Sequence, residues 1–167
     1  MNAVTSKPFI LTRTFDAPRK LVWEVMTQAE HLKHWMGPTG QLSHATVDLR
    51  PGGIFHYGMA MPDGTVMWGK WTFKEIVPPE KLVVIVAFSD ADKGETRHPM
   101  APDWPLETIS TTTLVEKGGK TFMTLEWRAY NASAEEQAVF DGAHDSMTQG
   151  WGGTMNALET YLKQLQS

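Results

Sequence analysis

The chain has 167 residues, a length that suits one domain. It carries 15 Lys and Arg against 19 Asp and Glu and shows no basic stripe, which argues against nucleic acid or an anionic membrane surface as a partner. Cysteine is absent, which excludes disulfides, thiolate metal sites and cysteine nucleophiles and fits a reducing compartment.

The N-terminal part predicts a strand that leads into two short helices. Residues 9–15 alternate and contain β-branched and aromatic residues, a pattern typical of a strand. Pro18 follows where a helix would begin, with Asp16 available as its cap. Apolar residues continue at helical spacing over 21–26, and a second helix is predicted over 29–35, ended by the Gly-Pro dipeptide that follows.

The middle of the chain changes to the two-residue period of strands. Aromatic and methionine residues alternate with polar or small residues over 55–61 and again over 67–74, with a Pro-Asp-Gly turn between them. This pattern predicts a β-hairpin with one solvent-facing side. Residues 82–88 form a nearly continuous apolar run, which indicates a more buried strand.

A second hairpin is predicted further along, after a long connection. Residues 107–115 and 121–127 have strand character and flank a Gly-Gly turn. Between the two hairpins, residues 90–105 are rich in proline, glycine and charge. A connection of this length is either a lid or binding element, or a disordered hairpin tip.

The C-terminal part predicts a long helix. Ser133 followed by Glu136 fits a capping box, so a short helix is expected to start there. An apolar helical stripe follows, formed by Met147, Trp151, Met155, Leu158, Leu162 and Leu165. Gly150, Gly152 and Gly153 interrupt it, and each interior glycine costs roughly 1 kcal/mol relative to alanine. Either a close approach to the sheet, a kink or space for a ligand offsets this cost, or the helix begins after the glycines.

Several short motifs resemble those of a known family. They are Phe15-Asp16-Ala17-Pro18-Arg19, Glu30-His31-Leu32 with Trp35 and Gly37-Pro38, Asp48-Leu49-Arg50-Pro51-Gly52-Gly53, Pro62-Asp63-Gly64, Glu75-Ile76-Val77-Pro78-Pro79-Glu80-Lys81-Leu82, and Gly150-Trp151-Gly152-Gly153-Thr154 with Leu158 and Tyr161-Leu162. Their order and spacing resemble the activator of heat-shock-protein-90 ATPase homologue family, part of the START/Bet v 1-like (SRPBCC) superfamily.

The resemblance implies an α+β helix-grip fold. In that fold a curved antiparallel sheet of about six to seven strands wraps around a long C-terminal helix, two short helices follow the first strand, and an apolar cavity lies inside. We expect a single domain over residues 1–167, with a core over about 9–164. The eukaryotic co-chaperones of the family carry an additional N-terminal domain that contributes to chaperone binding, and we expect no such domain in these 167 residues.

The expected cavity is the strongest functional prediction. The chain contains seven Trp, seven Phe and ten Met, and methionine adapts to irregular ligands. The alternative is a solidly packed core. The residues predicted to line the cavity are Trp35, Phe55, Tyr57, Met59, Trp71, Phe73, Met123, Leu125, Trp127, Met147, Trp151 and Met155.

The histidines offer weak metal or catalytic signals. His31 and His34 have the spacing to share a metal, but no third ligand lies nearby in sequence, so surface positions are the alternative. His56 alternates with the aromatic residues and is placed on the outer face of the sheet. His144 lies near the start of the last helix, where it either packs or caps, or reaches the cavity mouth.

Few acidic residues suit acid–base chemistry. Glu126 and Arg128 are predicted to form a cross-strand surface pair on the face opposite Trp127. Glu75 shares the parity of Trp71, so it either points into the cavity with a raised pKa or is solvated because the strand ends before it.

The superfamily includes lipid carriers, polyketide cyclases, co-chaperone domains and resistance proteins, so the resemblance implies no single activity. We expect a binding protein for a small apolar molecule such as a lipid, a polyketide or an aromatic metabolite. The alternatives are a chaperone-associated protein-interaction domain and an enzyme of cyclase or hydrolase type acting in the cavity, with binding favoured over catalysis.

Cofactor and targeting signals are absent from the sequence. It shows no P-loop, dinucleotide fingerprint, nucleophile elbow or zinc motif, so no cofactor and no metal are expected. No apolar run reaches the about 18 residues of a membrane span, and the N-terminus lacks a signal peptide's apolar stretch. We expect a cytoplasmic monomer or homodimer.

Overall fold

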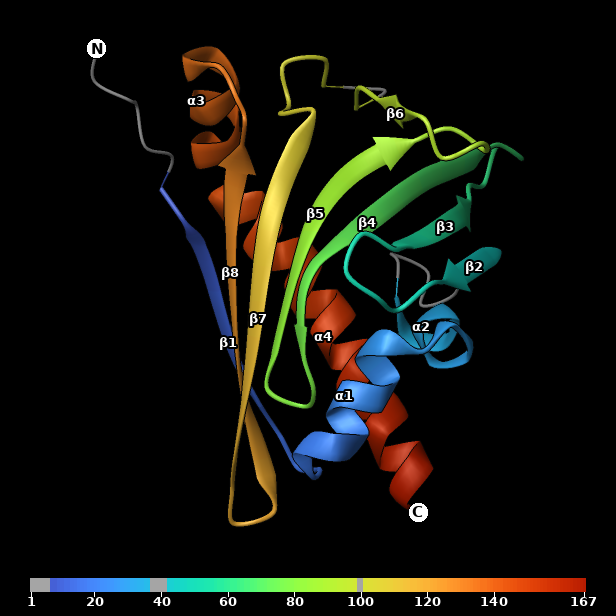
Figure 1. Cartoon of the computed structure of the whole chain (residues 1–167), viewed down its shortest axis with the longest axis vertical. Helices are drawn as coiled ribbons and strands as arrows, with labels where there is room; N and C mark the ends of the chain where they lie inside the picture. Colours follow the sequence, from blue (N-terminus) through green and yellow to red (C-terminus); the bar gives the residue numbers. More distant parts are fainter. Residues whose placement is uncertain (1–6, 37–41, 99–100) are drawn as a thin grey trace.

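The computed structural model describes residues 7–36, 42–98 and 101–167 and contains one antiparallel sheet and four helices (Figure 1). The strands are β1 (Phe9–Phe15), β2 (His44–Val47), β3 (Ile54–Ala60), β4 (Val66–Val77), β5 (Lys81–Ser89), β6 (Glu95–Thr96), β7 (Glu107–Lys117) and β8 (Lys120–Tyr130). The helices are α1 (Arg19–Thr27), α2 (Ala29–Trp35), α3 (Ala134–Gly142) and α4 (His144–Gln166).

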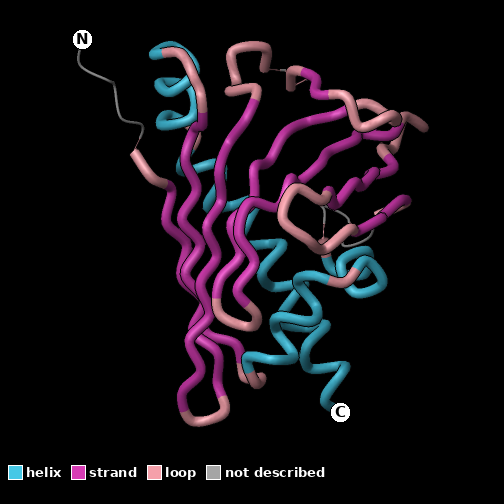
Figure 2. The backbone as a smooth tube through the Cα atoms, viewed as in Figure 1, coloured by secondary structure: helices cyan, strands magenta, loops and turns pink. Residues whose placement is uncertain are grey.

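The strands follow the order β1-β8-β7-β5-β4-β3-β2, and β6 pairs with β5 beside this path. The sheet curves, and α4 runs along one side of it while α1 and α2 lie beside the C-terminal half of α4 (Figures 1 and 2). The predicted helix-grip architecture is therefore confirmed. The sheet has eight strands, more than the six to seven expected, and the two that the sequence pattern did not predict are the short strands β2 and β6. The predicted end of α2 at Gly37-Pro38 lies outside the described residues.

The alternating pattern of the strands decides which residues enter the core. In β8, buried Thr121, Met123 and Leu125 alternate with exposed neighbours, as the two-residue period requires. Helix α4 covers this face with Met155, Leu158 and Leu162, each at most 2% exposed. The predicted apolar stripe of α4 ends there, because Leu165 is 41% exposed.

The N-terminus of α1 is capped differently from the prediction. The helix begins at Arg19, and Pro18 is its extended N-cap residue without a side-chain hydrogen bond. The prediction of Asp16 as the cap is therefore wrong. A carboxylate from β7 serves instead, because the Arg19 backbone N–H donates to Oε1 of Glu116 at 2.7 Å.

The capping box of α3 is confirmed. The Ser133 side chain accepts from the backbone N–H of Glu136 at 3.1 Å, and the Glu136 carboxylate accepts from the backbone N–H of Ser133 at 2.9 Å. Two N–H groups at the helix start are thereby satisfied.

The three glycines of the last helix lie inside it. Helix α4 starts at His144, so the alternative that it begins after Gly153 is wrong. A Cβ atom built on Gly150, Gly152 or Gly153 would meet no neighbouring atom within 4 Å among the described residues. A close approach to the sheet therefore does not explain these glycines.

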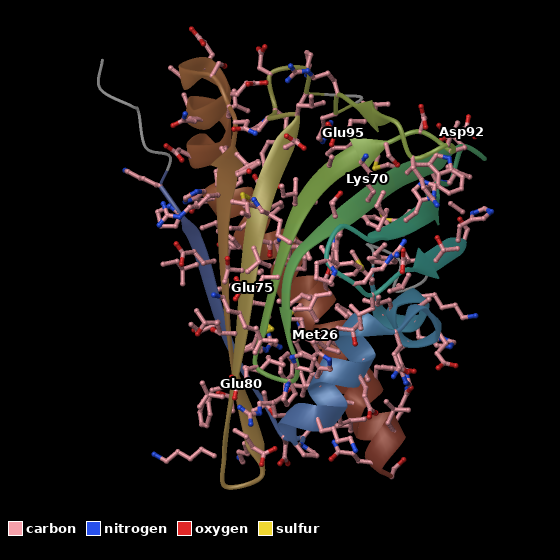
Figure 3. The ribbon with its side chains drawn as sticks, viewed as in Figure 1. Met26, Lys70, Glu75, Glu80, Asp92 and Glu95 are labelled. Atoms are coloured by element: carbon pink, nitrogen blue, oxygen red, sulfur yellow. The ribbon has the colours of Figure 1, made fainter. Side chains whose placement is uncertain are left out.

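A β-bulge in β4 explains the position of Glu75. The pairing with β5 shifts register between Phe73 and Glu75, so Ile76 takes the partly buried position instead. Glu75 is solvent-exposed and forms an ion pair with Lys81 at 3.3 Å; Figure 3 labels it on this strand. The alternative that Glu75 is solvated is therefore correct. The expected reason, that the strand ends before Glu75, is wrong because β4 continues to Val77.

Glu126 and Arg128 also differ from the prediction in one respect. They form an ion pair at 2.6 Å on the face opposite the buried Met123 and Leu125. Both residues belong to β8, so the pair runs along one strand and the predicted cross-strand arrangement is wrong.

Candidate functional site

A pocket of about 290 Å³ lies against the inward face of the sheet. Its wall combines β3, β4, β5, β7 and β8 with one residue of α4 and the described part of the 90–105 connection. The lining residues are Met36, Tyr57, Met59, Met67, Trp68, Gly69, Trp71, Val86, Ala87, Phe88, His98, Trp104, Pro105, Thr108, Ser110, Trp127 and Trp151.

Five of the twelve predicted lining residues border this pocket. They are Tyr57, Met59, Trp71, Trp127 and Trp151. The other seven are buried in the packed interior and do not line it: Trp35, Phe55, Phe73, Met123, Leu125, Met147 and Met155. Six of them point inward where helices already fill the space, because α1, α2 and the C-terminal half of α4 pack against the sheet there. Met147 belongs to a separate cluster with Phe9 and Phe140.

Sequence reasoning missed several lining residues. Val86 and Phe88 lie within the predicted buried strand, and the parity of that strand would have selected them. Thr108 and Ser110 lie at inward positions of β7, but their polar side chains gave no apolar signal. Trp104 belongs to an irregular connection, so no periodicity could have placed it.

The described part of the 90–105 connection forms a wall of the pocket. Strand β6 attaches it to β5, and Arg97 forms an ion pair with Glu136 of α3. The ring of Trp104 packs at 5.5 Å from Phe140 and 6.3 Å from Trp127, measured between ring centroids. This arrangement favours the binding-element interpretation of the connection.

Tyr57 brings a neutral phenol to the pocket. It lies opposite Gly69 in the β3–β4 ladder, and a Cβ atom on Gly69 would come within 2.5 Å of the phenol oxygen. Glycine at this position therefore allows the ring to lie across β4. Burial raises the pKa of Tyr57 to about 12, while a hydrogen bond with Trp71 acts in the opposite direction.

His98 adds a neutral imidazole at the other side. Its ring lies 4.7 Å from the Phe88 ring and 6.4 Å from the Trp104 ring. Burial lowers the pKa of His98 below its ordinary 6.5, which favours the uncharged form at neutral pH. Among the described residues that line the pocket, none is Asp, Glu, Lys or Arg.

Charged groups gather instead on the outer face of the sheet. Nζ of Lys70 lies 3.8 Å from the Glu95 carboxylate and donates to the Lys93 carbonyl at 3.0 Å; Figure 3 labels Lys70 and Glu95 near each other. Burial, followed by the neighbouring Glu95, raises the pKa of Glu107. The sheet thus separates a charged outer cluster from an uncharged inner pocket.

All four histidines singled out in the sequence pack against other rings. His31 and His34 both contact Tyr161 of α4: Nδ1 of His31 is 2.7 Å from the phenol oxygen, and the His34 ring stacks at 5.6 Å. His144 packs against Phe9 and Phe140. In the described ranges, no group of three or more His, Asp or Glu residues is arranged to hold a metal.

His56 lies on the outer face of β3, as predicted, but it is only 7% exposed. The Trp68 indole stacks on its ring at 4.8 Å with an interplanar angle of 8°. Its Nε2 atom lies 3.0 Å from the Asp90 carbonyl oxygen. The solvent-facing side of the hairpin is therefore partly covered by its own aromatic residue.

Comparisons with known proteins give a family match and structural relatives. The family model described as "Activator of Hsp90 ATPase homolog 1-like protein" matches residues 16–163. Protein NE0264 from Nitrosomonas europaea is 26% identical with a TM-score of 0.73, covering 95% of this chain and 96% of that one. A protein from Arthrobacter aurescens is also 26% identical, with a TM-score of 0.75 and coverage of 94% and 86%.

A third solved structure, Ms6760 from Mycobacterium smegmatis, is 26% identical with a TM-score of 0.68, covering 92% of this chain and 88% of that one. No curated protein matches the chain. None of the helices in the described ranges has the length and apolar character needed to cross a membrane.

Proposed function

The chain belongs to the family of Activator of Hsp90 ATPase homolog 1-like proteins, and from this premise we propose that it binds a small hydrophobic molecule. The observation that carries the proposal is the pocket of about 290 Å³ between the sheet, Trp151 of α4 and the described part of the 90–105 connection. Ligand sites are typically concave and apolar, with a few polar groups that fix orientation.

The composition of the wall supports this function. Trp71, Trp104, Trp127 and Trp151 supply large apolar surfaces, and aromatic side chains contribute strongly to binding because each buries much area. Met59 and Met67 add flexible side chains that adjust to the shape of a ligand. Tyr57 and His98 supply neutral polar atoms without the desolvation cost of a charge.

The test is binding of an uncharged fluorescent probe, N-phenyl-1-naphthylamine, together with native mass spectrometry of the protein purified without added ligand. We expect saturable binding that the Trp104→Ala variant weakens about tenfold, a change of about 1.4 kcal/mol. Phe122→Ala removes an aromatic ring that is 44% exposed and does not line the pocket, so it should leave binding unchanged. Absence of any probe binding, with only unliganded protein in the mass spectrum, would contradict the proposal.

A protein-interaction function is the second candidate, because one observation favours it. Val115 and Phe122 are paired across β7 and β8 and are 58% and 44% exposed. Exposed apolar neighbours of this kind mark interaction surfaces more often than isolated ones do. The test is the ATPase rate of a heat-shock-protein-90 chaperone with and without the protein; an increase that Phe122→Ser removes would support this function, and an unchanged rate would eliminate it.

Catalysis in the pocket requires a polar side chain with a shifted pKa, and Tyr57 and His98 meet that condition. Burial is the main cause of both shifts, and it favours the neutral form of each group. Neutral groups in an apolar wall suit binding of an uncharged ligand without further chemistry, so we place binding before catalysis.

A further inference from the structure

We infer that the pocket selects uncharged aromatic molecules that carry one hydroxyl or carbonyl group, and that the Ser110 hydroxyl pairs with this group. The inference rests on the proposed function and names the ligand class of the same pocket. Three observations carry it: the absence of charge in the lining, the rings that form the wall, and a single hydroxyl on an otherwise apolar row of the sheet.

The first observation concerns charge. The described lining contains no ionised side chain, and its two titratable groups, Tyr57 and His98, are both held neutral by burial. A carboxylate or ammonium ligand would lose its hydration on entry without gaining a partner of opposite charge. Such an uncompensated transfer is costly, so the pocket should discriminate against charged molecules.

The second observation concerns shape. The rings of Trp104 and Trp151 both contact the Trp127 ring edge-on, at 6.3 and 5.8 Å with interplanar angles of 64° and 89°. Phe88 and Tyr57 add further rings to the wall. Planar ligands can stack on or meet the edges of such rings, and these contacts contribute beyond the area buried. A flexible alkyl chain lacks them.

The third observation concerns Ser110. The side chain faces inward on β7, between Val84 of β5 and Trp127 of β8 in the same row. It is 9% exposed and lines the pocket. Among the described residues, no group is hydrogen-bonded to its hydroxyl, whereas the hydroxyls of the buried Thr27 and Thr121 each donate to a backbone carbonyl at 2.7 Å.

A ligand that fills the pocket would exclude water from the Ser110 hydroxyl, so a ligand that supplies a hydrogen-bond partner avoids leaving this group unsatisfied. The pocket volume of about 290 Å³ lies at the lower end of the about 300–1,000 Å³ that is typical of ligand pockets, which suits a two-ring molecule. A ring system of that size, with one oxygen substituent directed at β7, satisfies both the wall and Ser110.

The experiment is calorimetric titration with four probes: 2-naphthol, naphthalene, 2-naphthoate and 1-decanol. We expect 2-naphthol to bind about fivefold to tenfold more tightly than naphthalene, the range of one neutral hydrogen bond. Naphthoate and decanol should each bind at least about tenfold more weakly than 2-naphthol.

Ser110→Ala should weaken 2-naphthol binding about fivefold to tenfold and leave naphthalene binding unchanged. Ser110→Thr keeps a hydroxyl and should retain part of the preference. The matched control is Thr112→Ala, which removes the next inward hydroxyl of β7, at a residue that does not line the pocket. Thermal unfolding of each variant checks that it is folded.

The outcomes separate this inference from the function on which it rests. If decanol or naphthoate binds as tightly as 2-naphthol, or if Ser110→Ala retains the preference for 2-naphthol over naphthalene, the inference is overturned while the binding function stands. If none of the four probes binds, both are overturned.

Discussion

The position or the hydrogen bonding of several groups in this protein depends on one residue in a neighbouring strand or helix. Tyr57 lies flat across β4 because its ladder partner, Gly69, has no side chain. Glu116 of β7 caps α1 from outside the helix, and Glu136 both caps α3 and pairs with Arg97 of the 90–105 connection. Each arrangement gives a direct test by substitution.

We predict that Gly69→Ala destabilises the protein, because the new Cβ atom would lie 2.5 Å from Cζ and from the phenol oxygen of Tyr57. Forcing an extra methyl group into a packed site typically costs about 1–3 kcal/mol. The measurement is urea unfolding of the wild type, the Gly69→Ala and Tyr57→Ala single variants and the Tyr57→Ala;Gly69→Ala pair. In the Tyr57→Ala background the cost should fall by more than half, and an equal cost in both backgrounds would show that the clash is not the cause.

A second residue-scale prediction concerns pH and Glu136. Its hydrogen bond from the Ser133 backbone, followed by Arg97, holds the pKa of this carboxyl below its ordinary 4.5. A folded-state pKa below the unfolded value stabilises the fold above about pH 4.5, and this contribution is lost as pH falls through the lower folded-state pKa. Glu136→Ala should therefore cost about 1 kcal/mol at pH 7, and this cost should decrease steadily as the pH is lowered below 4.5, by urea unfolding.

Glu135→Ala provides the matched control, since it removes a carboxylate from the same helical turn but leaves the capping box intact. A cost for Glu136→Ala that does not change with pH would contradict the electrostatic part of this explanation.

At the scale of helices and strands, the local sequence pattern agrees with the tertiary packing in some elements and not in others. Strand β1 and helix α2 occupy the ranges predicted from their patterns, because the periodicity of each matches the face that it buries. Helix α4 is different: it contains three glycines at which the structure shows no packing requirement. None of the three lines the pocket either.

We predict that Gly153→Ala stabilises the protein by about 1 kcal/mol, and that Gly150→Ala adds a similar amount, because alanine favours the helix and both sites are open. The measurement is the midpoint of urea unfolding. Gly53→Ala is the contrasting control, since its Cβ would lie 2.0 Å from the Asp48 carbonyl oxygen and should destabilise. Loss of stability at Gly150 and Gly153 would point to a requirement for helix flexibility.

At the scale of the whole molecule, the inward face of the sheet is divided into two regions. One region is filled by α1, α2 and the C-terminal half of α4, through residues such as Leu32, Leu158 and Leu162. The other is bordered by Trp151 and by His98, Trp104 and Pro105 of the 90–105 connection, and it contains the pocket. Stability therefore depends mainly on the first region, and binding is proposed to depend on the second.

This division leads to a pH prediction for binding. Burial holds the pKa of His98 below 6.5, and a ligand that covers its ring further would lower that pKa again. Protonation then competes with binding, so the affinity for an uncharged probe should fall as pH decreases from 7.5 to about 5. Probe titrations of wild type and His98→Gln test this: the variant should show a flatter profile, and identical profiles would exclude His98 as the titrating group.

The sequence alone determined the type and approximate position of most elements, because helix and strand periodicities and capping residues are local properties. It also predicted which residues point inward, since parity along a strand fixes the side of the sheet. It failed where a local irregularity intervened. Because of the bulge after Phe73, Ile76 takes the inward position that the alternation had predicted for Glu75. No residue pattern in the sequence predicts such an insertion.

Only the tertiary structure decided which inward residues meet at the pocket. Trp35 and Met155 point inward as predicted, yet α2 and α4 fill the space around them, whereas Trp71 and Trp127 border open volume. Trp104 joins them from a connection without regular structure. Inward direction follows from the chain's local period, but the space beyond a side chain depends on the curvature of the sheet and on where the last helix crosses it.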